Sequence, residues 1–465
     1  MSVRSDAAPD RSAYERLRAA HVHAIQAGLE DHVARVDWSR EEIERFRTER
    51  LRALLTYARE RSPFHAARMR AFDPNSATVE DLARLPPMSK EEAQQEWDAI
   101  VTVPGLKRVG AERILAEQRW FSYSALGHQF FSSGGSSGVR GVYVWDWDLL
   151  VTLACLAWRM QLREERRSTA SPKHSRLVVL AAGEPPHAST PLFDVPTHEG
   201  MQTVVIAAGQ PFDQIRSAVA DARPTHLVGY ASVVARLARA SLAEELHIEP
   251  LRVSTNSEPL SEEDRAAISG AWSAPIHNLW GSTEIGVQAV GCSRGDGLHV
   301  CEDEVVLERV DEEGNPVPPD EPAVRTLATG LANRTFPFIR YDLGDEVTML
   351  SGECPCGSSL VRIAEVAGRR DDDFRYEGIG VVPASVFRHA LGTDTEISEY
   401  QVRQTPDGAD VLLVGSPDVG AVRNALLESL AHHGLSDPAI RVSVVARIER
   451  HAATGKLKRF VALSG

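Results

Sequence analysis

A loop of small residues between two strand-like runs is the first feature that could do chemistry. It consists of Ser132, Ser133, Gly134, Gly135, Ser136, Ser137 and Gly138. Backbone N–H groups in such a loop approach an anion without Cβ obstruction, and the hydroxyls donate further hydrogen bonds to phosphate oxygens. Because no Gly-Lys-Ser/Thr ends the loop, a P-loop phosphotransferase is excluded. We predict a phosphate-binding loop of another kind, with a flexible linker as the alternative.

Two clusters further along could hold the rest of a nucleotide. Asn278-Leu279-Trp280-Gly281-Ser282-Thr283-Glu284 places an aromatic face beside an open backbone, which suits stacking on a purine. Thr283 and Glu284 add a hydroxyl and a carboxylate, which suit a Mg²⁺ ion carried by phosphates. Asp345 follows in Ile339–Asp345 and is placed to accept hydrogen bonds from a ribose diol. An ordinary capped turn and a surface carboxylate are the alternative interpretations.

Two charged clusters lie nearer the C-terminus. The first, Gly368–Gly378, contains Arg369 and Asp371 and has the composition of a joint between domains, although a solvated acidic turn is the alternative. The second, residues 454–459, contains Lys456 and one more lysine. Only five lysines occur among 465 residues, so two in this short segment favour a specific use over a solvated basic tail.

The composition is that of an ordinary globular protein. The chain has 465 residues, of which 43% are hydrophobic and 25% charged, and its net charge is −14. This length favours two or three domains. The charge argues against nucleic acid or an anionic membrane as the main partner. No apolar run reaches about 18 residues and the N-terminus is polar, so we expect a cytoplasmic protein.

The pattern of elements indicates an α/β protein. Residues 1 to about 70 have helical spacing, and Ser89 follows a Pro pair as a fresh N-cap. Strand-like runs then alternate with helical runs, which predicts a largely parallel sheet; the predicted strands are 177–180, 203–206 and 226–230. We predict a large N-terminal domain of layered sheets and helices, residues 1–367, and a small mobile α+β C-terminal domain, residues 368–465.

The five clusters, taken in order, resemble the adenylate-forming superfamily of acyl-CoA ligases, peptide-synthetase adenylation domains and luciferases. Within it, the chain looks most like the phenylacetate–CoA ligase branch. Leu85–Lys90 resembles the N-terminal helical region of that branch, and Ser257-Glu258-Pro259 is similar to its Gly-Ala-Glu-Pro stretch before the adenine site. The resemblance covers the chain from about residue 50.

The resemblance implies activation of a carboxylic acid by ATP to an acyl-adenylate, followed by transfer to a thiol after the small domain rotates about Asp371. Lys456 is then the catalytic lysine, and Thr283 and Glu284 act at the α-phosphate and Mg²⁺. The other implied ATP-binding residues are the loop 132–138, Ser257, Glu258, Pro259, Asn278, Trp280, Gly281, Ser282, Asp345 and Arg369.

The implied substrate is an aryl or arylacetic acid, and the implied thiol is that of CoA. Transfer to the phosphopantetheine of a carrier protein or to an amine stays open, as does a homodimer. Tyr230 and Ser232 are expected to line the acid pocket. A non-catalytic nucleotide-binding protein of this fold is the alternative, but such a protein would be expected to lose Lys456 or Glu284.

Three departures from the family pattern concern the loop and the acid pocket. The loop ends Gly138-Val139-Arg140 where Gly-x-Pro is usual, and Asp342 stands where many members carry arginine. Val178–Phe193 matches no stretch of the family. The last two leave the acid specificity open.

Four cysteine and histidine residues predict a structural zinc site: Cys292, His299, Cys354 and Cys356. Three sulfurs and one imidazole form a closed tetrahedral set, which is typical of structural zinc, and some members of the branch look similar in carrying a Cys…His…Cys-x-Cys set. Cys301 could replace His299 as a ligand. Reduced cysteines that act as small hydrophobes are the alternative.

Overall fold

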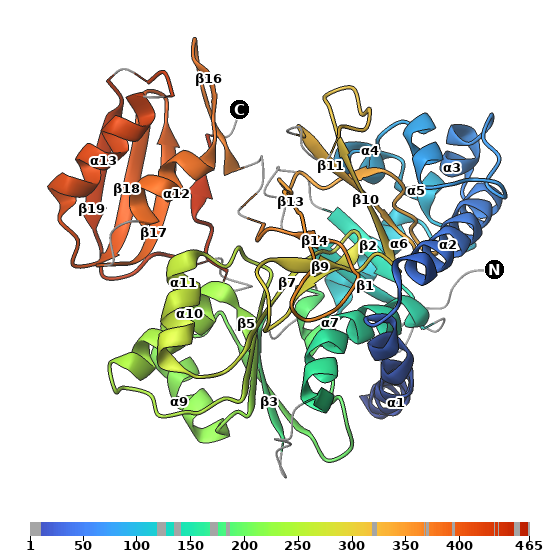
Figure 1. Ribbon diagram of the computed structural model, residues 1–465, viewed down its shortest axis with the longest axis horizontal. Helices are drawn as coiled ribbons and strands as arrows, with labels where there is room; N and C mark the ends of the chain where they lie inside the picture. Colours follow the sequence, from blue (N-terminus) through green and yellow to red (C-terminus); the bar gives the residue numbers. More distant parts are fainter. Residues whose placement is uncertain are drawn as a thin grey trace.

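The computed structural model describes most of the chain (Figure 1). The described residues are 11–118, 127–133, 141–167, 175–182, 187–318, 323–366, 368, 372–392, 396–431, 433–435, 437–450 and 456–463. Within these ranges, no helix combines the length and the apolar character needed to cross a membrane.

A sheet of nine strands forms the centre of the molecule, in the order β13-β14-β9-β8-β7-β6-β5-β3-β4. The parallel strands are β3 (Arg176–Ala181), β4 (Gln202–Ala207), β5 (His226–Tyr230), β6 (Arg252–Asn256) and β7 (Ile276–Ser282). The antiparallel extension consists of β8 (Gly286–Gly291), β9 (Leu298–Val300), β13 (Met349–Leu350) and β14 (Arg362–Ile363). The predicted α/β class is confirmed. The predicted parallel arrangement holds for β3 to β7, whereas the other half of the sheet is antiparallel.

Helices cover both faces of this sheet, as Figure 1 shows. They are α9 (Phe212–Ala222), α10 (Ala231–Leu242) and α11 (Glu262–Ala271) on one face, and α1 (Arg11–Arg35) and α7 (Trp147–Arg167) on the other. Val178 and Leu180 pack with the first group, and Leu177 and Val179 pack with the second. Because successive side chains of a strand point to opposite faces, a strand covered on both sides is apolar at every position.

Further helices, all short except α2, surround the N-terminal side. They are α2 (Arg40–Arg61), α3 (Pro63–Arg68), the 3₁₀ helix η1 (Glu80–Arg84), α4 (Lys90–Gln95), α5 (Trp97–Ile100) and α6 (Arg108–Glu117). Ser39 and Glu42 form a capping box at the start of α2. Ser89 accepts a hydrogen bond from the Glu92 backbone N–H at the start of α4, which confirms the predicted N-cap.

Smaller sheets complete the part of the molecule before residue 367. β1 (Gln129–Ser133) pairs antiparallel with β2 (Gly141–Trp145), so the predicted phosphate loop joins two paired strands. A three-stranded sheet consists of β10 (Val305–Val310), β11 (Arg325–Gly330) and β12 (Tyr341–Asp342), and α8 (Ser189–Phe193) is a single short helix.

Residues 372–463, which we call the C-terminal part, have a core of their own. Its elements are β15 (Phe374–Tyr376), β16 (Gly380–Val382), α12 (Ala384–Gly392), β17 (Ile397–Thr405), β18 (Gly408–Gly415), α13 (Val419–Ala431), β19 (Ala439–Val444) and β20 (Phe460–Val461). Phe374, Phe387 and Phe460 lie at the centre of a buried cluster whose members all come from this part. The exact domain boundary at residue 368 stays a prediction.

An acidic segment between β9 and β10, Glu302-Asp303-Glu304, holds the N-terminal helices to the sheet. Arg159 of α7 donates two hydrogen bonds to Asp303, at 2.7 and 2.9 Å, and both side chains are buried. Four more arginines, from α1 and α2, complete the cluster: Arg40 and Arg47 pair with Glu302, and Arg35 and Arg50 with Glu304.

We expect Arg159→Ala to lower the free energy of unfolding by about 3–5 kcal/mol, because it leaves the buried Asp303 carboxylate without its main partner. Arg166→Ala is the matched control on the same helix, since Arg166 pairs with Glu30 at the surface and such pairs contribute about 1 kcal/mol or less. Chemical denaturation of both variants measures the difference. Equal decreases in the free energy of unfolding of the two variants would show that the buried pair with Asp303 contributes no more to stability than a surface pair.

Candidate active site

The predicted Trp-Gly-Ser-Thr-Glu cluster forms the end of β7 and the turn into β8. The strand register shifts after Trp280. A Cβ atom at Gly281 would lie 2.5 Å from the Gly286 carbonyl oxygen, so this close approach requires glycine. The Ser282 hydroxyl accepts a hydrogen bond from a backbone N–H of the turn at 3.2 Å. The turn therefore presents Glu284 in a fixed position.

The Glu284 carboxylate is buried between two phenols. Tyr143 of β2 donates a hydrogen bond to Glu284 Oε1 at 2.6 Å, and Tyr341 of β12 donates to the same oxygen at 3.1 Å. Glu284 is 6% exposed. The Trp145 indole donates to the Thr283 carbonyl oxygen at 3.1 Å. Two of the predicted clusters, and strand β2 that follows the predicted phosphate loop, thus meet at one carboxylate.

Trp280 and Asp345 are also brought together, as expected for neighbouring parts of a nucleotide site. The Trp280 indole N–H donates a hydrogen bond to Asp345 Oδ2 at 3.1 Å, and both side chains are largely buried. This bond fixes the plane of the indole ring. An oriented aromatic face beside a carboxylate is the arrangement that adenine and ribose require.

Asn278 faces the interior instead. Its carbonyl oxygen accepts a hydrogen bond from the Thr255 hydroxyl at 2.9 Å, and its amide donates to Glu365. Burial raises the pKa of Glu365, and Arg265 opposes that effect. In the described structure, the Asn278 side chain links β7 to Thr255 of β6 and to Glu365. Its predicted contact with the nucleotide stays a prediction.

The Ser257-Glu258-Pro259 stretch follows β6. Ser257 has a φ of 64°, a left-handed conformation that is uncommon for a residue with a side chain. Glu258 accepts hydrogen bonds from the backbone N–H groups of Ser232 and Leu457, both at 2.9 Å. The stretch therefore contacts the C-terminal part next to Lys456.

Lys456 lies at the carboxyl end of β5. Its ammonium nitrogen is 5.1 Å from the centre of the Tyr230 ring, within the range of a cation–π contact. The Tyr230 hydroxyl accepts from the Ala182 N–H at 3.0 Å and contacts the Ser189 hydroxyl at 3.1 Å, while burial raises its pKa to about 12. The carboxyl edge of a parallel sheet is the usual ligand site of such a fold, and the lysine reaches that edge.

Several predicted residues lie outside the described residues, and their roles stay predictions: Gly134, Gly135, Ser136, Ser137, Gly138, Arg369 and Asp371. Ser132 and Ser133 end β1 and pair with Val142 and Gly141. Sequence reasoning missed Tyr143 and Tyr341 as partners of Glu284. Tyr341 stood inside a recognised cluster, but no local signal marked Tyr143.

The four predicted zinc ligands converge. Their ligand atoms all lie within 4.8 Å of one another, and all four side chains are buried. Cys292 Sγ is 3.6 Å from Cys354 Sγ, and Cys356 Sγ is 3.4 Å from His299 Nε2. Hydrogen bonding from Cys292, with a contribution from His299, holds the pKa of the Cys356 thiol well below its usual range. This favours the thiolate, the form that binds metals.

These distances fit a zinc ion. Bonds of about 2.3 Å to sulfur and about 2.0–2.1 Å to nitrogen at tetrahedral angles separate two sulfurs by about 3.8 Å and a sulfur from a nitrogen by about 3.5 Å. The alternative ligand, Cys301, is buried elsewhere, where its thiol interacts with Arg159. The geometry therefore favours His299 over Cys301.

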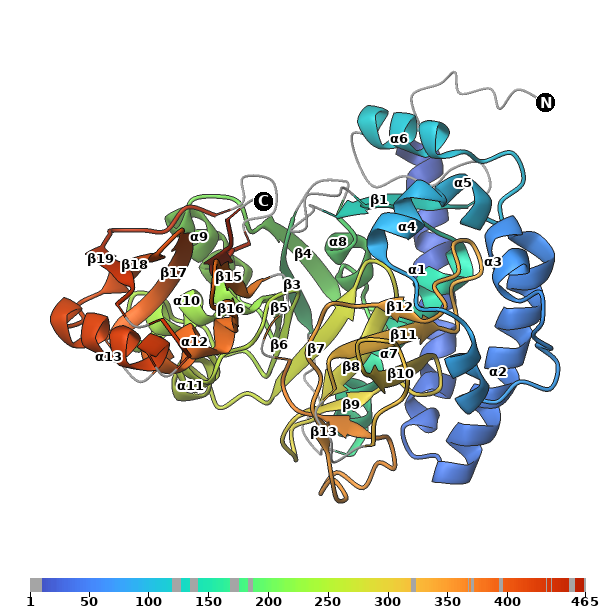
Figure 2. The same ribbon diagram turned by 90° about the horizontal axis from the view of Figure 1, so that it is seen from above.

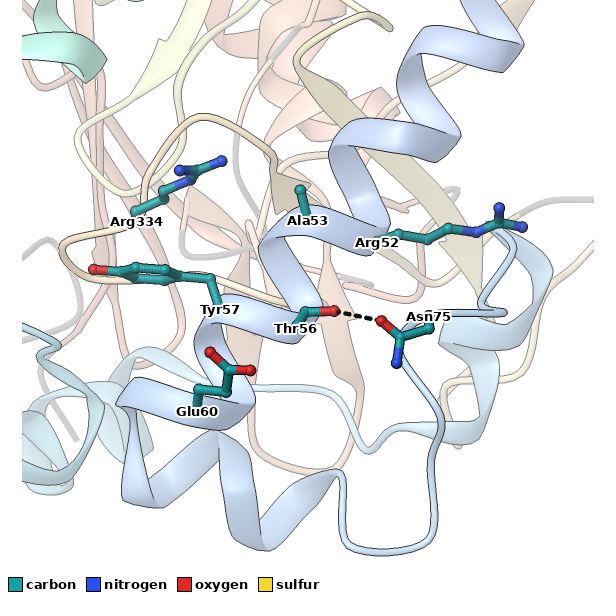
Figure 3. A pocket seen from close by; sticks show the side chains of 7 residues that line it. All are labelled: Arg52, Ala53, Thr56, Tyr57, Glu60, Asn75 and Arg334. Carbon is teal, nitrogen blue, oxygen red and sulfur yellow. Dashed lines mark hydrogen bonds between the residues drawn. The ribbon is translucent and has the colours of Figure 1, made fainter.

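A surface pocket of about 320 Å³ lies apart from these residues. It is lined by Arg52, Ala53, Thr56, Tyr57, Glu60, Asn75 and Arg334. Figure 3 shows that Arg52, Glu60 and Arg334 point in different directions, and the hydrogen bond between Thr56 and Asn75 closes one side. Because these groups do not converge on one point, we assign no function to the pocket.

Comparison with known proteins points to one family. The chain is 25% identical over 376 residues to a phenylacetate-coenzyme A ligase of Thermus thermophilus, a match that covers 78% of each chain. It is 27% identical over 240 residues to a phenylacetate-coenzyme A ligase of Aromatoleum evansii, covering 47% of this chain and 53% of that ligase. No protein-family model matches the chain.

Solved structures show the same fold. 2-Hydroxyisobutyryl-CoA ligase, in its postadenylation state with an acyl-AMP, matches 92% of this chain and 91% of its own with a TM-score of 0.69 and 18% identity. The same ligase in the thioesterification state gives a TM-score of 0.58 over 92% and 91%.

The sheet topology, the clustered site residues and these likenesses agree with the predicted resemblance to the adenylate-forming superfamily. Within that superfamily, the chain is similar in sequence to phenylacetate–CoA ligases, and its fold is that of an acyl-CoA ligase. The predicted resemblance and fold class are both confirmed.

Proposed function

We propose that this protein is an AMP-forming ligase that joins a carboxylic acid to a thiol, with CoA as the thiol. The observation that carries the proposal is the position of Lys456, which the C-terminal part brings onto Tyr230 at the carboxyl edge of the sheet. The relatives named above as CoA ligases support the same reaction class.

The chemistry begins with the acid. A carboxylate is a poor electrophile because its leaving group would be oxide. Attack of a carboxylate oxygen on the α-phosphorus of ATP forms an acyl-adenylate and releases pyrophosphate. The thiol sulfur then attacks the acyl carbon, the bond from that carbon to the phosphate oxygen breaks, and AMP leaves with the electron pair. The first step needs charge stabilisation more than covalent help.

The residues of this chain fit those needs. Trp280 would stack on adenine and Asp345 would hold the ribose hydroxyls. Lys456 would bridge the acid carboxylate and an α-phosphate oxygen, where charge moves during the reaction. The two hydrogen bonds to Glu284 both go to Oε1, so Oε2 is the atom that would reach a Mg²⁺ ion. That ion would neutralise phosphate charge.

The identities of the acid and of the acceptor rest on less evidence than the reaction class. We propose an aryl or arylacetic acid because two relatives are phenylacetate-coenzyme A ligases. Transfer to a carrier-protein thiol or an amine is the second candidate acceptor, and rotation about Asp371 between the two steps remains part of the proposal. A non-catalytic nucleotide-binding protein would have no need of a lysine at this position.

We also propose that Cys292, His299, Cys354 and Cys356 bind one structural zinc ion. They link the loop after β8, which holds Cys292, and strand β9, which holds His299, to the turn before β14. A closed set of four protein ligands stabilises the fold and leaves no position for catalysis.

Elemental analysis of untagged protein is expected to give about one zinc per chain. Cys354→Ser should lose the metal and unfold at a lower temperature, because one of four ligands is removed. Cys301→Ser is the matched control and should keep the zinc, since Cys301 lies beside Arg159 instead. Metal-free wild-type protein of normal thermal stability would contradict the proposal.

Lys456→Ala tests the proposed activity. A panel of carboxylic acids, assayed for pyrophosphate release with and without CoA, first identifies the acid. The variant should then lose about 100-fold or more in the rate of adenylate formation, with little change in ATP binding, because the lysine acts mainly in the transition state.

Lys458→Ala is the control for that experiment. Lys458 is exposed two residues along, so this variant removes the same charge from the same segment and should stay near the wild-type rate. Pyrophosphate release by Lys456→Ala within about threefold of wild type would show that the lysine is wrongly assigned.

A further inference from the structure

One carboxylate joins the two parts of the chain. Glu258 Oε2 accepts a hydrogen bond from the backbone N–H of Ser232, and Glu258 Oε1 accepts one from the backbone N–H of Leu457, both at 2.9 Å. Ser232 is the second residue of α10, whereas Leu457 directly follows Lys456. We call this pair of hydrogen bonds the Glu258 link.

The start of α10 explains why a carboxylate sits there. The N-cap residue Tyr230 makes no capping bond with its side chain, so the first N–H groups of the helix need an acceptor from elsewhere. A negative group at this end is also favoured by the helix dipole. Glu258 satisfies Ser232 with one oxygen and leaves the other for Leu457.

The backbone before Glu258 supports the same geometry. Ser257 is held with φ at 64° at the end of β6, and its hydroxyl donates to Asn256 Oδ1 at 2.9 Å. A residue with a side chain keeps such a conformation only where its surroundings impose it. The conformation of Ser257 thus helps to fix the direction of the Glu258 side chain.

The contacts around the link are polar. Arg459 pairs with Asp264 of α11 at 2.6 Å, and Arg450 donates to the Ser232 hydroxyl at 2.8 Å. Figures 1 and 2 both show the C-terminal part against α10 and α11. Hydrogen bonds between two lobes, such as the one from Leu457 to Glu258, can be exchanged for water at modest net cost, which suits a contact that forms and releases. The Arg459–Asp264 pair is more buried and costs more to separate.

We propose that Glu258 is a positioning residue for Lys456, acting through the backbone N–H of Leu457 and not by binding the nucleotide. It holds the lysine segment at the sheet edge while the acyl-adenylate forms. The proposal rests on the proposed function and adds a role to it. Each Glu258 oxygen accepts a hydrogen bond from a backbone N–H of the protein. We therefore propose this positioning role for Glu258 in place of the nucleotide contact predicted from the sequence.

Glu258→Gln tests this role. An amide presents one oxygen and one NH₂ group, so it faces one of the two N–H donors with a donor of its own. We expect pyrophosphate exchange to slow by about 10- to 100-fold with the KM for ATP within about threefold of wild type. The rate at which supplied acyl-adenylate is converted to thioester should stay within about threefold of wild type, because Lys456 acts in the first step and is not needed when the thiol attacks.

Two further variants make the result decisive. Glu262→Gln removes the same charge from an exposed residue at the start of α11 and should behave as wild type. Leu457→Pro deletes the donor on the other side without touching the α10 cap and should reproduce the split between the two half-reactions. A raised KM for ATP, or equal losses in both half-reactions, would overturn the proposal.

A measurement that does not depend on enzyme activity, the distance between α10 and the C-terminal part, separates this proposal from the proposed function. The five native cysteines are buried, so fluorophores can be attached to Leu242→Cys on α10 and Val444→Cys on β19, both exposed. Glu258→Gln should depopulate the energy-transfer state that predominates in the wild type with Mg²⁺ and ATP. An unchanged distribution would overturn the link. Absence of acid-dependent pyrophosphate release by the wild type would instead count against the proposed function.

Discussion

The site depends on one buried carboxylate held by two phenols. Glu284 comes from a turn of the central sheet, Tyr143 from the hairpin that carries the predicted phosphate loop, and Tyr341 from the small β10–β12 sheet. If these hydrogen bonds did not form, the buried carboxylate would be left unsatisfied at a cost of about 1–3 kcal/mol or more. The same contacts that satisfy Glu284 therefore bring three separate segments to one place.

A second constraint is the difference between the two junctions of the molecule. The N-terminal helices are joined to the sheet by buried ion pairs such as Arg159–Asp303, which are costly to break. The C-terminal part is joined by the hydrogen bond from the Leu457 backbone N–H to Glu258 and by the Arg459–Asp264 pair, whose carboxylate is also buried. The feature that distinguishes this second junction is therefore the backbone hydrogen bond to Glu258, which can be exchanged for water at modest net cost.

The sequence was informative where the signal is local. Strand alternation predicts β3, β4 and β5, Ser89 marks a helix start, and the Gly281 turn requires a glycine that the sequence supplies. The convergence of Cys292, His299, Cys354 and Cys356 is also accessible to sequence reasoning, because three cysteines and a histidine form a typical set of metal ligands.

The partners of the key carboxylates were not predictable. Tyr143 is 141 positions from Glu284, and Leu457 is 199 positions from Glu258. A tyrosine in a buried strand or a backbone N–H carries no mark of its partner, since the pairing depends on how the elements pack. Asn278 illustrates the same point, because its neighbours in sequence suggest a nucleotide ligand while its hydrogen bonds lie in the interior.

The fate of the carboxylate oxygen tests the central claim most directly. An acid labelled with ¹⁸O in its carboxylate is incubated with the protein, Mg²⁺, ATP and CoA, and the nucleotide product is examined by mass spectrometry. The account predicts AMP that carries one labelled oxygen, because a carboxylate oxygen attacks the α-phosphorus and stays with AMP when the thiol displaces it. Unlabelled AMP, or ADP with the label in inorganic phosphate, would contradict it.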